Sequence, residues 1–337
     1  MSEAAPSHKV NTTLNGDERT TVPRRRWFSP ILAVPTPVIF SVAAALAVLF
    51  LWRQGRLVEI MDSMRDVHPG RVVAILLVYA VSILLLGVRW HALVRMAGGI
   101  PHWTSSAEVF LTSVIVNYAA PIGLAVPTRA ALTIRDLELS PSQSGAVVGW
   151  EAALDVLALS VISAAWLILG GSDLVQAMTF DGRVLVLIAI IGVLVGVGVR
   201  VASRSAAIRS RIAPFAGRML SSPAQHPILA LVAVALTGGF WITQIGIMAA
   251  LLALFSVSIS LPLLLGIMGV PVLVGMLSPV PGGAGVREAL MAAAARLGGT
   301  PAGPVVLAAV AYRLALFLVT PLVWGAVRLA RATVNRH

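Results

Sequence analysis

Two arginines follow Pro/Gly-rich interruptions in otherwise apolar stretches of the chain. Arg129 lies eight residues after Pro121, and Arg287 lies eight residues after Pro279. Such breaks start a new helix, whose N-terminus offers free backbone N–H groups and partial positive charge to an anion. Broken apolar segments at corresponding positions of two halves indicate the substrate site of a transporter. We therefore expect both arginines to bind an anionic group; the alternatives are an interfacial anchor for Arg129 and an ion pair with Glu288 or another acid for Arg287.

Further residues at the two breaks extend this candidate site. Gly282 and Gly283 permit tight turns and close approach of a ligand to the backbone. Glu288 follows the second arginine directly. Asn117 precedes the first break, where it either contacts the substrate or caps backbone groups that the break leaves exposed.

Ionisable residues also lie inside apolar stretches that follow the breaks. Glu151 and Asp155 are four residues apart and so share one helix face. A carboxylate at the centre of a spanning helix costs roughly 2.5–3.5 kcal/mol, which favours a polar interior for this pair. Arg313 lies equally deep in an apolar stretch, and we expect it to pair with Asp155 or Glu151 and to attract a lipid phosphate. The alternative for Arg313 is a purely structural ion pair, and the alternative for Glu151 is a position at the membrane interface. Gln244 is expected to hydrogen-bond between helices, and the alternative is contact with a ligand.

Composition indicates what must position these residues. The chain has 337 residues, 58% hydrophobic and 12% charged, and its mean hydropathy is +0.91. Soluble domains carry about 25% charged residues, so the sequence predicts an all-α polytopic membrane protein. The two broken segments, 106–135 and 262–299, are predicted to form re-entrant hairpins. Six spanning helices are expected at 36–52, 71–90, 146–169, 184–202, 227–257 and 303–326.

Charge then sets the expected orientation. The loop 203–226 has four Arg and no acid, and the Arg-rich sequence before the first span and after the last places both termini in the cytoplasm. With these sides fixed, 106–135 enters and leaves from the cytoplasm and 262–299 from outside. Irregular backbone at membrane depth is tolerated only where it is buried in protein or lines a wet cavity. Two opposed hairpins would form such a cavity.

The same logic predicts an inverted repeat. The offset of 158 residues that relates Arg129 to Arg287 also relates Asp155 to Arg313. The expected organisation is a disordered cytoplasmic tail at 1–34, one transmembrane domain at 35–331 with halves at about 35–170 and 184–330, and a cytoplasmic tail at 332–337.

Several function classes are disfavoured. The chain has no Cys, which excludes disulfides and thiolate metal sites, and its six His show no metal-ligand spacing. It has no phosphate-binding loop followed by Lys and no nucleophile motif, so we expect no cofactor, no metal and no enzymatic activity. The net charge of +11 follows the positive-inside rule and does not indicate nucleic acid. Arg25-Arg26 is read as a topological flank, not an export signal.

The order of these residues resembles the lysylphosphatidylglycerol synthase transmembrane-region family, also called the flippase-like domain family. The motifs that carry this resemblance are Arg89-Trp90, Asn117, Pro121, Arg129, Glu151, Asp155, Pro281-Gly-Gly-Ala-Gly-Val-Arg287-Glu288 and Arg313. The family's first break usually reads Pro-x-Arg-x-Gly-Glu-x-x-Arg. Pro121 and Arg129 are retained here, whereas Gly123, Ala125 and Val126 replace the inner Arg, Gly and Glu. No aminoacyltransferase domain is expected, so the chain should not make lysylphosphatidylglycerol by itself.

The resemblance implies a membrane lipid translocase. Its expected substrate is an anionic lipid, either a phospholipid, a polyprenyl-phosphate or a glycolipid, moved across the plasma membrane. The resemblance allows a homo-oligomer. Two alternatives stay open at this point: an ion-coupled small-solute carrier, and an accessory subunit of a lipid-modifying enzyme.

Overall fold

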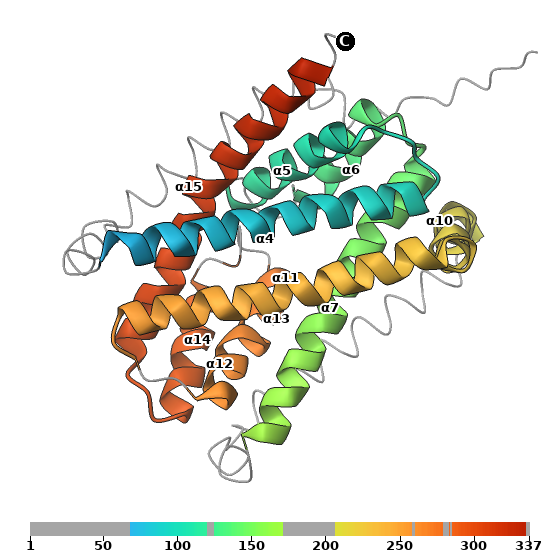
Figure 1. Ribbon diagram of the computed structural model, residues 1–337. Helices are drawn as coiled ribbons and strands as arrows, with labels where there is room; N and C mark the ends of the chain where they lie inside the picture. The colour runs from blue at the N-terminus through green and yellow to red at the C-terminus, as the bar shows by residue number, and fades with distance from the viewer. Residues whose placement is uncertain are drawn as a thin grey trace, which may run out of the picture.

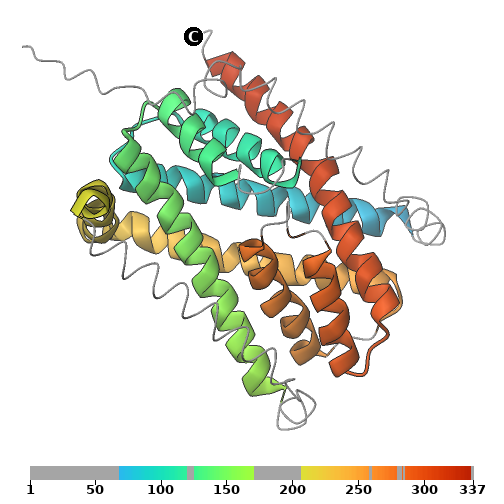
Figure 2. The same cartoon turned by 180° about the vertical axis from the view of Figure 1, so that it is seen from behind.

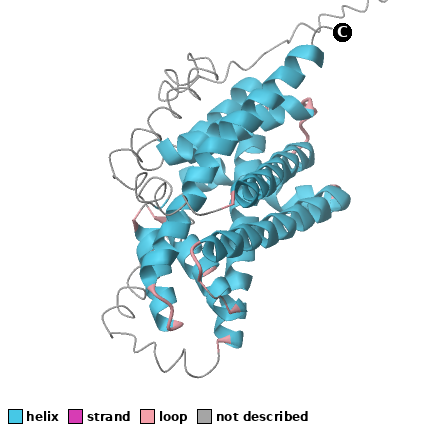
Figure 3. Cartoon of the chain, turned by 60° about the vertical axis from the view of Figure 1, so that its left-hand side comes forward, coloured by secondary structure: helices cyan, strands magenta, loops and turns pink. Residues whose placement is uncertain are grey.

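The computed structural model describes residues 68–119, 125–170, 206–257, 260–278, 283 and 285–334. Within these residues every regular element is helical (Figure 3). The α-helices are α4 (Pro69–Met96), α5 (Trp103–Ala119), α6 (Ala125–Asp136), α7 (Pro141–Leu169), α10 (Ala206–Gln225), α11 (Pro227–Leu254), α12 (Leu261–Met268), α13 (Val270–Leu277), α14 (Val286–Leu297) and α15 (Ala302–Val334).

Four of these helices, α4, α7, α11 and α15, are long and apolar enough to cross a membrane. The prediction of an all-α polytopic membrane protein is therefore confirmed. The expected spans at 36–52 and 184–202, and the tail at 1–34, lie outside the described residues. Helix α15 continues to Val334, past the expected end of the membrane domain at 331.

Local sequence explains where the long helices begin. Pro occupies the first turn of α4, α7 and α11, where its missing N–H is not needed. Helix α7 has a complete capping box, in which Ser140 accepts from the backbone of Gln143 and the Gln143 side chain accepts from Ser140 N. The Gln143 amide also donates to Ala97 O, which joins the start of α7 to the end of α4.

Each apolar segment with a Pro/Gly break forms a compact group of short helices. The first consists of α5 and α6, and the second of α12, α13 and α14, which pack against one another. One break was not predicted: Gly269 separates α12 from α13. Pro271 removes a helical N–H, and a Cβ at Gly269 would lie 2.8 Å from Ser163 Oγ, so the backbone bends where α7 lies closest.

The described helices repeat in length and order. Helices α4 and α11 both have 28 residues and begin 158 residues apart, at Pro69 and Pro227. Helices α6 and α14 both have 12 residues. Helices α4 and α11 lie side by side and run in opposite directions (Figure 1). Helices α7 and α15 also run in opposite directions (Figure 1).

The two groups of short helices pack across the molecule. Helix α5 contacts α15, and α12 and α13 contact α7, so these short helices pack on the last helix of the other half (Figure 2). Helices α6 and α14 contact the last helix of their own half, α7 and α15. The arrangement encloses a common interior between the α5–α6 pair and the α12–α14 group.

Polarity is distributed as a membrane requires. Large apolar side chains are exposed on the outward faces of the long helices, including Leu77, Leu157, Ile242 and Leu322. Buried polar and charged side chains lie inside the bundle, where protein partners replace water. These exposed apolar faces suit contact with lipid chains.

Candidate functional site

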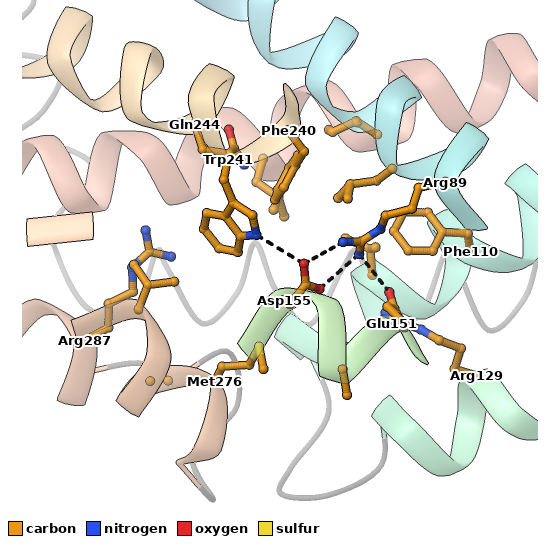
Figure 4. A pocket seen from close by; sticks show the side chains of 18 of the residues that line it. Arg89, Phe110, Arg129, Glu151, Asp155, Phe240, Trp241, Gln244, Met276 and Arg287 are labelled. Carbon is orange, nitrogen blue, oxygen red and sulfur yellow. Dashed lines mark hydrogen bonds and ion pairs between the residues drawn. The ribbon is translucent and has the colours of Figure 1, made fainter. Parts of the chain in front are cut away.

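A cavity of about 420 Å³ lies inside the bundle, where the two groups of short helices meet. Its charged lining comes from four helices: Arg89 from α4, Arg129 from α6, Glu151 and Asp155 from α7, and Arg287 from α14 (Figure 4). Aromatic side chains form much of the remaining wall, namely Tyr79, Phe110, Phe240, Trp241 and Tyr312. Cavities of 300–1,000 Å³ with apolar walls and a few convergent polar groups are typical ligand sites.

The Arg89–Asp155 pair forms one side of the cavity. Arg89 Nη1 and Nη2 donate to the two oxygens of Asp155 at 2.6 and 3.0 Å, a bidentate geometry. Thr237 accepts from Arg89 Nη1 at 3.3 Å, and Trp241 Nε1 donates to Asp155 Oδ1 at 3.2 Å. Because Arg89 is only 1% exposed, this pair is held in a water-poor interior, where its charges interact strongly.

Glu151 connects this pair to the first break. Its Oε2 accepts a hydrogen bond from Arg129 Nη1, and its Oε1 lies 3.6 Å from Arg89 Nη2. Arg129 Nε donates to Ser113 Oγ of α5 at 2.7 Å. The guanidinium of Arg129 also lies over the Phe110 ring, 5.2 Å from its centroid. Arg129 therefore lines the cavity and is bound to side chains of α5 and α7.

The second break places Arg287 on the opposite side of Asp155 from Arg129 (Figure 4). Gly283 has φ +66°, and a Cβ there would lie 2.7 Å from Gly275 O. The break thus packs directly on α13, and a Cβ at Gly275 would in turn meet the Cβ of Arg287 at 3.1 Å. The guanidinium lies 4.7 Å from the ring centroid of Tyr312.

The prediction that Arg313 pairs with Asp155 or Glu151 is wrong. Arg313 Nη2 lies 2.7 Å from Glu288 Oε1, and Arg313 does not line the cavity. Glu288 Oε2 accepts from Gly285 N at 2.7 Å, which caps α14. Because α14 and α15 are neighbours, this acid is the nearer one, and Asp155 is already held by Arg89.

Arg89 is a cavity residue that the pattern of charges in the sequence did not single out. Its position in α4, which continues to Met96, places it in the interior. Its adjacency to Trp90 in the family resemblance was the available signal. Gln244 was expected to bond between helices, but its Oε1 has no hydrogen-bond partner among the described residues. For Asn117 only the backbone is described, and Gly282 lies outside the described residues.

The cavity combines an apolar, partly aromatic wall with charged groups inside the helical bundle. A family model for the lysylphosphatidylglycerol synthase TM region matches residues 38–325. The chain belongs to this family. Membership in the lysylphosphatidylglycerol synthase TM-region family makes it a membrane protein with a lipid-related function. A comparison with curated proteins found no match.

All the charged residues that line the cavity fall inside the part of the chain that matches the lysylphosphatidylglycerol synthase TM-region family. Three guanidinium groups and two carboxylates give this lining a net charge of +1. No group of three or more His, Cys, Asp or Glu in the described part of the chain is arranged to hold a metal ion. The arrangement can therefore hold an anion by charge and hydrogen bonding from arginine.

Proposed function

We propose that this protein is a lipid translocase that moves an anionic, phosphate-bearing lipid across the plasma membrane. The observation that carries this proposal is the cavity of about 420 Å³, with Arg89, Arg129 and Arg287 converging on it inside a bundle of membrane helices. Its volume suits a polar head group, and the apolar outer faces of the helices suit acyl or prenyl chains that stay in the bilayer.

Charge balance supports an anionic substrate. The described lining carries three arginines against Glu151 and Asp155, a net charge of +1. A phosphodiester with one negative charge would make the occupied cavity neutral, which lowers the cost of burying it in a low-dielectric interior. Arginine also matches the oxygens of a phosphate with paired donors.

The arginines would act unequally. Glu151 and Asp155 already hold Arg129 and Arg89, so these two cations need a rearrangement before they can donate to a substrate. Arg287 lines the cavity on the other side of Asp155 and stacks on Tyr312 (Figure 4). In our proposal Arg287 binds the phosphate from that side. The ion pair of Glu288 with Arg313 positions α14 without touching the lipid.

Alternating access around the two groups of short helices would move the head group. The equal helix lengths, the 158-residue offset and the opposite directions of α4 and α11 favour an inverted repeat. In such a repeat, the α5–α6 pair and the α12–α14 group act as re-entrant hairpins that open to opposite sides. We propose passive or ion-coupled movement with both termini in the cytoplasm, and no enzymatic step.

The direct test is lipid transfer in proteoliposomes with the purified wild-type protein. Fluorescent anionic phospholipid and polyprenyl-phosphate probes should cross faster than in protein-free vesicles, while a zwitterionic phosphatidylcholine probe with the same chains should not. Folded protein that moves no anionic probe would overturn the proposal. Competition by a water-soluble anion in a binding assay would instead favour a solute carrier.

The proposed inversion has its own test, because the chain lacks Cys. Single cysteines at Thr128 and Ala284 are labelled with a membrane-impermeant maleimide from each side of the membrane. Labelling of the two positions from opposite sides supports opposed hairpins. Labelling of both from the same side would contradict them.

A further inference from the structure

Gln244 is a buried polar residue whose function is not explained by the helix packing. It lies on α11, is 3% exposed and lines the cavity. Its Oε1 has no hydrogen-bond partner among the described residues. A buried amide oxygen without a partner loses the hydrogen bonds that it makes with water, so natural proteins rarely keep one without a use.

The residue belongs to a polar stripe on α11. Thr237, Trp241 and Gln244 are spaced i, i+4 and i+7, and so share one helix face. The first two are occupied by neighbouring helices: Thr237 accepts from Arg89 of α4, and Trp241 donates to Asp155 of α7. Gln244 is the next residue of the stripe after Trp241 (Figure 4). Unlike the first two residues, its Oε1 forms no hydrogen bond to a neighbouring helix among the described residues.

The chemistry of the other polar groups shows what Gln244 adds to the cavity. Guanidinium groups donate hydrogen bonds and suit phosphate oxygens, which only accept. The carboxylates of Glu151 and Asp155 accept, but both are engaged by arginine. Gln244 Oε1 is thus a buried neutral acceptor in the cavity wall, and a small side-chain movement would offer it to a donor on the substrate, next to the phosphate.

We propose that Gln244 is a specificity-determining residue that accepts a hydrogen bond from a hydroxyl group on the lipid head group. The substrate class is therefore an anionic lipid whose phosphate carries a hydroxylated head group. A simple alkyl phosphodiester lacks the donor and leaves Oε1 unpaired. This assignment rests on the proposed function for the place where the head group binds.

The test compares two lipids with the same charge. Phosphatidylglycerol and phosphatidylethanol are both singly charged phosphodiesters, but only the first carries hydroxyl groups. Lipid binding is measured by the rise in Tm of the detergent-solubilised protein, and transfer is measured in proteoliposomes, for wild type and Gln244→Met. Wild type should prefer phosphatidylglycerol by roughly tenfold, and Gln244→Met should remove that preference by weakening phosphatidylglycerol alone.

A second readout separates substrate recognition from a structural role. If Gln244 held helices together, Gln244→Met would lower the Tm of the lipid-free protein. We expect an unchanged or higher Tm, because the variant removes an unpaired polar atom and keeps the side-chain length. The matched control is Ile242→Met, a lipid-facing position on the same helix, 71% exposed, which should change neither the preference nor the Tm.

The outcomes distinguish this inference from the proposed function. Equal binding of the two lipids by wild type, or a preference that persists in Gln244→Met, overturns the role of Gln244. A lower Tm for lipid-free Gln244→Met also overturns it. A binding preference that depends on Gln244, without transfer of either lipid, supports the recognition role and overturns translocation. Failure of both lipids to bind overturns both.

Discussion

The two halves of the bundle use the same kind of ion pair with opposite polarity. In the first half the cation lies on the short helix, since Arg129 of α6 pairs with Glu151 of α7. In the second half the acid lies on the short helix, since Glu288 of α14 pairs with Arg313 of α15. Each pair joins the helix after the break to the last long helix of its half.

This reversal explains how the cavity is charged. In the first half the acid of the pair lines the cavity, where Asp155 and Arg89 accompany it. In the second half both partners, Glu288 and Arg313, lie outside the lining, and Arg287 remains as the cavity's cation from that half. A repeated scaffold thus produces an asymmetric site, with the carboxylates on one side.

The largest expected effect comes from the first half. Arg89→Met leaves the largely buried Asp155 without its bidentate partner, which should destabilise the protein by about 3 kcal/mol. Thermal unfolding in detergent measures this as a fall in Tm. The double variant Arg89→Met/Asp155→Leu removes both charges and should regain most of the stability. A double variant as unstable as the single one would show that the pair is not the cause.

Reversing the second pair tests the comparison itself. Glu288→Arg and Arg313→Glu should each destabilise by about 3 kcal/mol, because each puts like charges together in a buried place. The double reversal copies the polarity of the first half and should recover most of the lost stability. A loss of about 1 kcal/mol should remain, because the double variant lacks the hydrogen bond by which Glu288 caps Gly285 N. Additive losses in the double variant would contradict a simple exchange of polarity.

The backbone of the second break provides a smaller effect. Gly283→Ala adds a Cβ that meets Gly275 O at 2.7 Å at a positive φ, and should destabilise by about 1–3 kcal/mol. Gly285 also has a positive φ, but its Cβ would meet nothing within 4 Å, so Gly285→Ala should cost less. Tm values for the two variants check the order. Equal losses would show that the close packing on α13 contributes nothing.

The smallest expected effect lies where the halves meet through α5 and α15. Glu108 is buried and pairs with Arg331 at 2.6 Å and Arg328 at 3.5 Å. Because the Arg331 side chain is 38% exposed, solvent screens the pair, and Glu108→Gln should cost about 1 kcal/mol. The loss should shrink as salt is raised in the unfolding assay. A loss that is independent of salt would indicate a packing effect.

Much of the architecture was predictable because hydropathy and Pro/Gly breaks act locally. The four long helices and the placement of Arg129 and Arg287 after the breaks follow from such signals. The partner of Arg313 does not, since any acid on a neighbouring helix satisfies the same rule and only packing selects Glu288.

Arg89 shows the same limit for single residues. Its place near the C-terminal end of an apolar stretch is equally consistent with a cytoplasmic flank and with a buried cavity residue. The bend at Gly269 depends on the approach of Ser163 from α7, which no local pattern contains. Contacts between distant helices therefore decided what the sequence left open.

An anionic lipid head group is proposed to cross the membrane through this cavity, with Arg287 among the groups that bind it. The most direct measurement is transfer of a fluorescent phosphatidylglycerol probe in proteoliposomes with wild type, Arg287→Gln and Ile242→Met. We predict that Arg287→Gln slows transfer by roughly 10- to 100-fold while the protein stays folded, and that Ile242→Met transfers at the wild-type rate. Transfer by folded Arg287→Gln at the wild-type rate would contradict the account.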